Sequence, residues 1–123
     1  MNSVKPAGVG NRLLAGLPRR DHLHLLAGCE QIELVGADVL IKQGEQVRFV
    51  YFPINGFVSQ MTTIEHGMRL EIAQVGNEGM LGSELALGIT QALLQWLVRG
   101  AGSSHRMDGM RPRSGGSSGS AQR

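Results

Sequence analysis

Short stretches in which apolar and polar residues alternate follow one another from residue 29 to residue 107, and turns that contain glycine separate them. Alternation with a period of two predicts half-buried β-strands. We expect strands at 29–34, 39–41, 49–52, 57–64, 68–75, 91–99 and 104–107. Strands that recur at intervals of about 8–12 residues, with turn signals between them, predict a mainly β sandwich or jelly-roll barrel.

Two dipeptides give the sharpest turn signals, Asn55-Gly56 and His66-Gly67. Glycine adopts a positive φ without steric cost, so both are expected where the chain reverses. The second dipeptide joins the fourth and fifth expected strands into a β-hairpin. Pro53 is expected to end the third strand, because proline donates no hydrogen bond to a ladder.

Two short helices are expected before the strands, and one helical segment is expected among them. Asn11 can cap the first helix, and Pro18 separates it from the second, which ends at Gly28. The apolar faces that would pack on the β core consist of Leu13, Leu14 and Leu17, and of Leu23, Leu25 and Leu26. A break in the strand pattern at 76–88 predicts the helical segment, whose apolar residues are Met80, Leu81, Leu85 and Leu87.

Length and composition fit one domain with a modest core. The chain has 123 residues, of which 41% are hydrophobic but only 4% aromatic, so Val, Leu and Ile must fill the interior. We expect a flexible N-terminus at 1–10, a folded domain at 11–108 and a disordered tail at 109–123. Seven of the last ten residues are Gly or Ser, and such a segment cannot bury enough apolar surface to order itself.

The formal net charge of +2 is unevenly distributed. Residues 1–98 contain seven Lys or Arg and nine Asp or Glu, whereas residues 99–123 contain five Arg and one Asp. Three of those five Arg, at 111, 113 and 123, fall in a segment that is not expected to fold. We therefore do not infer a nucleic-acid-binding surface from the basic balance.

Cys29 is the only cysteine, so neither an internal disulfide nor a cysteine-ligated metal or iron–sulfur site is expected. A reducing cytoplasm is the expected compartment. No apolar run approaches the ~20 residues of a membrane helix, and the N-terminus lacks the apolar region of a secretory signal. No nucleophile and base form a known catalytic motif, so we do not expect an enzyme.

Several motifs in order and spacing resemble the Crp/Fnr family of transcription regulators. They are the lead-in 11–18, then Gly44-Glu45, Val-Tyr-Phe-Pro at 50–53, Gly-Phe-Val-Ser at 56–59 and Val-Gly-Asn-Glu-Gly-Met-Leu-Gly at 75–82. The resemblance covers roughly residues 11–108 and is to the N-terminal sensor domain, of the cyclic-nucleotide-binding type. It implies a double-stranded β-helix, or jelly roll, flanked by short helices.

In nucleotide-binding relatives, the phosphate lies at the N-terminus of a short helix, beside a Gly-Glu pair and an Arg followed by Ser or Thr. By resemblance, Gly82, Ser83 and Glu84 keep the Gly-Glu part with one residue inserted. The region of the Arg reads Leu-Leu-Gln at 93–95, and the next basic residue is Arg99. The candidate ligand site therefore consists of Gly82, Ser83, Glu84 and Arg99. The expected ligand is a small-molecule effector, either a cyclic nucleotide or another compound. No metal or other cofactor is expected.

Family members usually continue into a long dimerisation helix and a C-terminal winged helix-turn-helix, and the chain shows neither. The resemblance thus implies the sensor part of a regulator that binds DNA only through a domain missing here. As partners it implies a second copy or related regulators, and no membrane. A frameshift, a truncation and a genuinely short gene are all compatible with the sequence.

Two other interpretations stay open. In the first, the chain is an interaction module that pairs with intact family members through exposed apolar surface. In the second, it is a small cupin-like metal-binding protein. The second interpretation needs His and carboxylates that converge inside the barrel, yet His22 and His24 diverge by about 200° on a helix. The charged residues that lie close in sequence within the β unit are expected to be solvated; they are Glu45, Arg48, Arg69 and Glu71.

Overall fold

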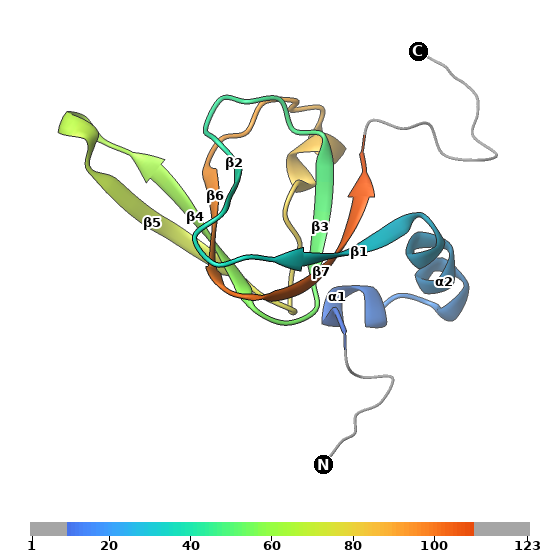
Figure 1. Ribbon diagram of the computed structural model, residues 1–123. Helices are drawn as coiled ribbons and strands as arrows, with labels where there is room; N and C mark the ends of the chain where they lie inside the picture. The colour runs from blue at the N-terminus through green and yellow to red at the C-terminus, as the bar shows by residue number, and fades with distance from the viewer. Residues whose placement is uncertain (1–9, 110–123) are drawn as a thin grey trace.

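The structure is a computed structural model that describes residues 10–109 (Figure 1). Two short α-helices come first, α1 (Arg12–Ala15) and α2 (Arg19–Ala27). The strands within these residues are β1 (Cys29–Leu34), β2 (Val39–Ile41), β3 (Phe49–Pro53), β4 (Phe57–Thr63), β5 (Arg69–Val75), β6 (Gln95–Gly100) and β7 (Gly102–Asp108). Two 3-10 helices lie among them, η1 (Glu65–Gly67) and η2 (Ser83–Leu87). The expected mainly β fold with short flanking helices is confirmed. The expected terminal segments lie outside the described residues, except for Gly10 and Gly109.

The strands form two antiparallel sheets, the walls of a jelly roll (Figure 1). One sheet has the order β1-β7-β3 and the other has the order β2-β6-β4-β5. Neighbouring strands come from distant parts of the chain, because β1 pairs along its whole length with β7, from Cys29 opposite Met107 to Leu34 opposite Gly102. Long-range pairing of this kind joins the first and last strands into one wall.

Aliphatic side chains fill the interior of the roll around two aromatic rings. Trp96 on β6 is 1% exposed and Tyr51 on β3 is 5% exposed, and their rings meet edge to face with centroids 6.0 Å apart. The aliphatic members of this core are Leu34, Ile41, Val47, Val58, Leu81, Ala92 and Val98. The low aromatic content predicts such a core, and the structure confirms it.

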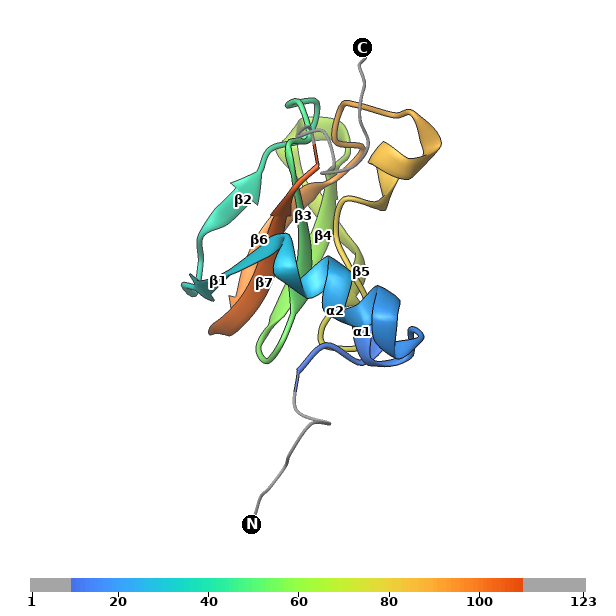
Figure 2. The ribbon, with the colours of Figure 1, turned by 90° about the vertical axis from the view of Figure 1, so that its right-hand side faces the viewer.

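A second apolar cluster lies on the other side of β3, beneath the helices. Val50 and Phe52 flank Tyr51 along β3, and they pack with Leu14 of α1 whereas Tyr51 packs inside the roll. Partly buried side chains surround them: Leu17, Leu25, Leu26, Cys29, Met80, Leu85 and Met107. Figure 2 shows α1 and α2 on the side of the β1-β7-β3 sheet that faces away from the other sheet. This sheet therefore stands between two cores.

The side chain of Asn11 connects the first helix to the β structure. Its Oδ1 accepts a hydrogen bond from the Leu14 backbone N–H at 3.0 Å, which confirms the expected cap. Its Nδ2 donates to the carbonyl oxygens of Pro53 at 2.9 Å and of Gly79 at 2.8 Å. One buried amide thus holds α1 against the end of β3 and the turn that precedes η2.

The two sharp turn signals are confirmed, since Gly56 has φ 78° and Gly67 has φ 75°. At Gly56 a side chain is also excluded by space, because a Cβ there would lie 2.8 Å from the carbonyl oxygen of Ala101. His66 shares the left-handed conformation of the hairpin turn, with φ 65°. Figure 1 shows the β4–β5 hairpin projecting away from the rest of the roll.

Several strand boundaries differ from those expected. Residues 91–94 do not belong to β6, because the backbone of Ala92 pairs instead with the loop at 44–45, donating to Glu45 at 2.8 Å. Pro53 belongs to β3 and pairs with Ser104. Proline has no backbone N–H to donate, but this is tolerated here because Pro53 is the last residue of the strand. β7 is longer than expected at both ends because it pairs with both β1 and β3.

Three of the expected apolar contacts are wrong. Leu13 of α1 was expected to pack on the β core, but it is 43% exposed. Leu23 of α2 was expected to face inward, but it is 55% exposed because only Leu25 and Leu26 of this helix reach the cluster under β3. Leu87, expected to pack as part of a helical segment, is 77% exposed at the end of η2. That segment is a single 3-10 turn, too short to bury one face.

Candidate functional site

The chain enters η2 through a backbone conformation that requires glycine. Gly82 has φ 99°, and a Cβ there would lie 2.9 Å from the carbonyl oxygen of Phe49. The residue before it, Leu81, exchanges two backbone hydrogen bonds with Tyr51 of β3, at 3.0 and 2.9 Å. Gly82 is buried, Ser83 is exposed and Glu84 is half-buried. Gly82 therefore lies directly against β3, and Ser83 and Glu84 follow it in η2.

Arg99, the fourth predicted residue, lies at the opposite end of β3. Arg99 is next to Gly100 of β6, and Gly100 pairs with Phe57. Phe57 begins β4, shortly after the end of β3. Gly82 instead contacts Phe49 and Val50, where β3 begins. The structure does not bring Arg99 to the η2 segment, because the residues between them run the length of the roll as β6. Ligand binding by the predicted residues stays a prediction.

A cavity of about 430 Å³, which we call the Trp96 cavity, opens beside the start of β3. Its lining combines aromatic, aliphatic, cationic, anionic and amide side chains: Leu40, Ile41, Glu45, Gln46, Arg48, Phe49, Tyr51 and Trp96. One wall is shaped by backbone pairing of the loop at 44–47 with residues 90–92, where Val47 donates to the carbonyl of Thr90 at 2.7 Å. Residues 90–92 follow η2 closely in the chain, but none of residues 82–84 lines this cavity.

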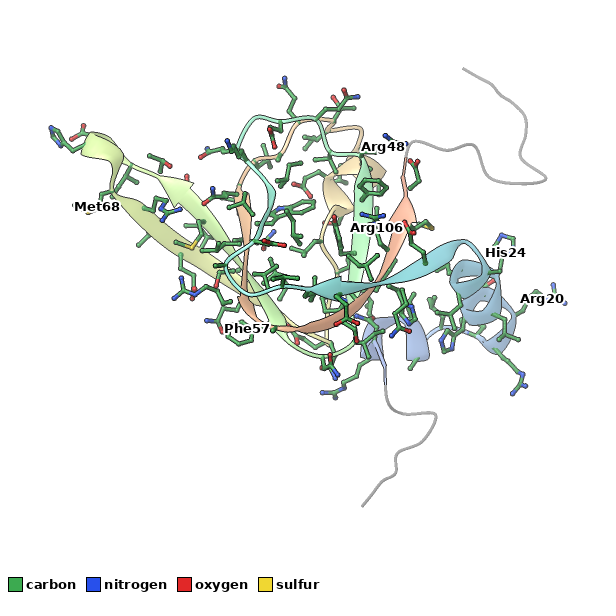
Figure 3. The ribbon with its side chains drawn as sticks, in the orientation of Figure 1. Arg20, His24, Arg48, Phe57, Met68 and Arg106 are labelled. Carbon is green, nitrogen blue, oxygen red and sulfur yellow. The ribbon has the colours of Figure 1, made fainter. Side chains whose placement is uncertain are left out.

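Two arginines stack on one ring at the mouth of this cavity. The guanidinium carbon of Arg106 lies 4.2 Å from the centroid of the Phe49 ring, and that of Arg48 lies 5.2 Å from it (Figure 3). Arg106 pairs with Glu30 at 2.6 Å and Arg48 pairs with Asp108 at 3.2 Å. The ring and the carboxylates hold both guanidinium planes in place, as stacked cations prefer.

These pairings join residues that are far apart in the sequence. Arg48 pairs with Asp108 of β7, and the nearby Glu45 accepts instead from the Lys42 backbone N–H at 2.8 Å. Arg106 lies on β7 between two paired strands, where a strand was expected at 104–107. The paired carboxylates lie 60 and 76 residues away from these arginines in the sequence. Patterns of residues that are close in sequence therefore do not predict these pairs.

The titratable groups around the ring have shifted pKa values. Burial raises the pKa of the Tyr51 hydroxyl, and the neighbouring Arg106 partly opposes that shift. The hydrogen bond to Glu30 raises the pKa of Arg106 further above its ordinary value. At neutral pH the site therefore presents a protonated phenol next to a fixed cation.

Trp96 contributes a buried donor that the protein does not use. Its indole Nε1 is buried and has no hydrogen-bond partner among the described residues. A buried donor without an acceptor destabilises a folded protein by about 1–3 kcal/mol. Trp96 lines the cavity, but its Nε1 has less than 1 Å² of accessible surface, so a ligand acceptor atom can relieve this penalty only if the indole moves. Trp96, Tyr51 and Arg106 were not predicted as site residues from the sequence. A single Trp on a strand usually indicates a core residue, and no local pattern marks the other two.

A second cavity of about 390 Å³ lies under the helices, and we call it the helix-side cavity. Its lining is almost wholly apolar: Leu13, Leu14, Leu17, Leu25, Val50, Phe52, Met80, Gly82, Ser83, Leu85, Ala86, Met107 and Gly109. Ser83 is the only polar side chain among these residues. The predicted segment thus borders the helix-side cavity through Gly82 and Ser83, whereas charged side chains line only the Trp96 cavity of these two.

The described residues contain no group of three or more His, Cys, Asp or Glu side chains that could hold a metal ion. Cys29 is half-buried on β1, and burial raises the pKa of its thiol. No helix in the described part of the chain is long and apolar enough to cross a membrane. The residues present at 10–109 do not support the cupin-like interpretation.

Known structures with the same fold were found, although no protein-family model and no curated protein sequence matches the chain. The N-terminal domain of a transcriptional regulator from Streptomyces coelicolor A3(2) is 19% identical, with a TM-score of 0.68 over 80% of this chain and 68% of that one. The c-di-GMP responsive global regulator of Xanthomonas campestris is 16% identical, with a TM-score of 0.64 over 72% and 44%.

A third structure comes from a different class of regulator. It is the regulatory subunit of a cAMP-independent protein kinase A from Trypanosoma brucei, in a mutant form bound to cAMP. It is 17% identical, with a TM-score of 0.69 over 77% of this chain and 35% of that one. The chain thus spans well under half the length of two of these three proteins. At such low identity the likeness shows the fold, a jelly roll of the type found in the sensor domains of Crp-type regulators.

Proposed function

We propose that this chain is an effector-sensing module of a Crp/Fnr-type transcription regulator, and that its effector occupies the Trp96 cavity. The observation that carries the proposal is the unpartnered indole Nε1 of Trp96 beside a cavity of ligand size. The fold, shared with N-terminal domains of transcriptional regulators, supports a regulatory rather than a catalytic role. DNA binding belongs, in this proposal, to a separate domain of the regulator.

The lining favours a planar effector that carries hydrogen-bond acceptors and a negative charge. The Trp96 and Tyr51 groups offer donors to an acceptor, and the Phe49 and Tyr51 rings offer stacking surfaces. Arg48, whose side chain is 65% exposed, gives a cation at the mouth. Cyclic nucleotides combine these features, so they are the first ligands to test. In this proposal the effector contacts neither Arg99 nor the segment at 82–84, because Gly82 and Ser83 line the helix-side cavity instead.

Titration with cAMP and cGMP tests the proposal, with isothermal calorimetry and the fluorescence of Trp96 as two readouts. The chain contains one Trp, so a fluorescence change reports on this cavity alone. We expect heat and a fluorescence change that saturate together. The absence of both at high micromolar concentration would contradict a nucleotide effector.

Two variants locate the ligand. Tyr51→Phe removes one donor from the Trp96 cavity, and we expect affinity to fall about three- to tenfold, the usual effect of losing one hydrogen bond. Ser83→Ala removes the only polar side chain of the helix-side cavity and leaves that affinity unchanged. If Ser83→Ala weakens binding and Tyr51→Phe does not, the effector occupies the helix-side cavity and the assignment is wrong.

A further inference from the structure

The strand β5 forms an exposed edge of its sheet. In the order β2-β6-β4-β5 it has a neighbour on one side only, and its residues from Arg69 to Ile72 are all exposed. The unpaired backbone groups of such an edge can pair with another strand. Figure 3 shows Met68 at the far end of this hairpin, away from the helices. The edge is therefore accessible to another molecule.

Apolar side chains gather on the same hairpin. Four exposed hydrophobic residues belong to it, with exposed fractions of 46% for Ile64, 61% for Met68, 51% for Leu70 and 52% for Ile72. No proline or lysine protects the strand, and both commonly block pairing at sheet edges. The surface combines an open ladder with apolar contacts, and pairing with a second strand would cover both.

The charges on β5 match those of a second copy of the same strand. Two antiparallel copies centred on Leu70 place Arg69 opposite Glu71 of the second copy, and Glu71 opposite its Arg69. The same register places Met68 opposite Ile72 in both directions, so that apolar residues meet apolar residues. We propose that two copies of this chain associate through antiparallel pairing of their β5 edges, centred on Leu70.

Neighbouring registers are disfavoured by charge. Antiparallel ladders keep hydrogen-bonding residues opposite one another, so the centre of the register moves in steps of one whole residue, and the nearest alternatives are centred on Arg69 and on Glu71. A centre on Arg69 places two arginines opposite each other, and a centre on Glu71 places two glutamates opposite each other. Like charges directly opposite destabilise a sheet, whereas opposite charges stabilise it. The centre on Leu70 alone satisfies both Arg69 and Glu71.

The present contacts of these two residues leave capacity for the pairing. Arg69 Nη1 donates to Gln95 Oε1 at 3.0 Å, and Glu71 Oε1 accepts from the Ser59 hydroxyl at 2.6 Å. A guanidinium has five N–H groups and a carboxylate has two oxygens, so each can bind a further partner. The register between β4 and β5 is regular from Arg69 to Glu71, and a β-bulge leaves Ile72 without a partner on β4. The bulge limits the pairing to a short central stretch.

A pairing with twofold symmetry is closed. It joins the two four-stranded sheets into one and uses both β5 edges, so no further copy can add at this edge. The strand at the other edge, β2, has three residues. The expected product is a dimer rather than a growing fibre.

Charge reversal tests the register in the full chain by sedimentation equilibrium. We expect the unchanged protein to dimerise with rising concentration, and Arg69→Glu or Glu71→Arg alone to weaken the dimer at least about tenfold. An equimolar mixture of the two single variants restores complementary pairs at both positions, as does the double variant, so both should dimerise like the unchanged protein. Circular dichroism checks that each variant is folded.

A cysteine cross-link gives a second test that does not depend on charge. In a Cys29→Ser background, Leu70→Cys places two thiols opposite each other at the symmetry axis, within disulfide reach. Copper phenanthroline takes up the two electrons and the two thiol protons are released, so a covalent dimer forms. Gln74→Cys, beyond the bulge, should remain uncross-linked. A monomeric unchanged protein, single reversals that dimerise normally, or equal cross-linking at both positions would overturn the proposal.

Discussion

Gly82 is the residue on which the path between β5 and η2 depends most. Its φ of 99° suits few other residues, and a Cβ would press on the Phe49 carbonyl oxygen at 2.9 Å and on Val50 Cα at 3.2 Å. We predict that Gly82→Ala lowers the free energy of unfolding by about 2–4 kcal/mol, from backbone strain and overpacking together. Urea denaturation followed by circular dichroism measures this loss.

Gly88 supplies the matched control at the other end of η2. It also has a positive φ, of 81°, but a Cβ there meets no atom within 4 Å. Gly88→Ala should therefore cost only the conformational strain, about 1–2 kcal/mol. Equal losses for the two variants would show that the close approach of Gly82 to β3 does not matter for stability.

The sequence predicts single residues well where local geometry decides their role. The cap by Asn11 and the positive φ of Gly56 follow from side-chain chemistry and steric limits within a few residues. The roles of Trp96 and Arg106 depend on strands that meet only after folding, so no local pattern marks them. For the same reason the sequence groups Arg99 with Gly82, whereas β6 separates them.

Among the secondary-structure elements, α1 has four residues and depends on contacts outside itself. Asn11 provides three of them: the cap to Leu14 and the amide bonds to Pro53 and Gly79. We predict that Asn11→Ala lowers the free energy of unfolding by about 2–4 kcal/mol, because it loses the cap and leaves two carbonyls without this donor. Thermal and urea denaturation give the value.

Asn11→Ser separates the two contributions. The serine hydroxyl can still accept from the Leu14 N–H, but it cannot reach both carbonyl oxygens. Its loss of stability should therefore fall between those of the unchanged protein and of Asn11→Ala. A serine variant as unstable as the alanine variant would mean that the cap contributes nothing here.

The strand pattern predicts the existence of most elements, and tertiary pairing decides their ends. β7 extends to Gly102 and Asp108 because two neighbours supply ladder partners, which a polar sequence does not reveal. Residues 91–94 were expected to belong to a strand, yet the backbone of residues 90–92 pairs with the loop at 44–47 before β6 begins. Periodicity is a local signal, whereas each strand end is set by the strand beside it.

At the scale of the whole molecule, β3 joins the two cores. Tyr51 belongs to the core of the roll, and its neighbours Val50 and Phe52 belong to the cluster under the helices. The side chain of Leu85 packs against both clusters. Because one strand supplies both sides, neither core can lose its packing without disturbing the other, and we expect the domain to unfold as a single cooperative unit.

Leu14→Ala tests this coupling from the helix side. Leu14 is 2% exposed in the cluster under the helices, so its truncation should lower the free energy of unfolding by about 2–4 kcal/mol. Trp96 lies in the other core, yet its fluorescence transition in urea should move to lower concentration together with the circular dichroism transition. If the Trp96 transition stays in place while the helical signal is lost earlier, the helices form a separate unit. If the two transitions coincide, the two cores unfold together. Leu14 belongs only to the cluster under the helices and Trp96 only to the core of the roll, so the coupling between them runs through β3, which contributes to both.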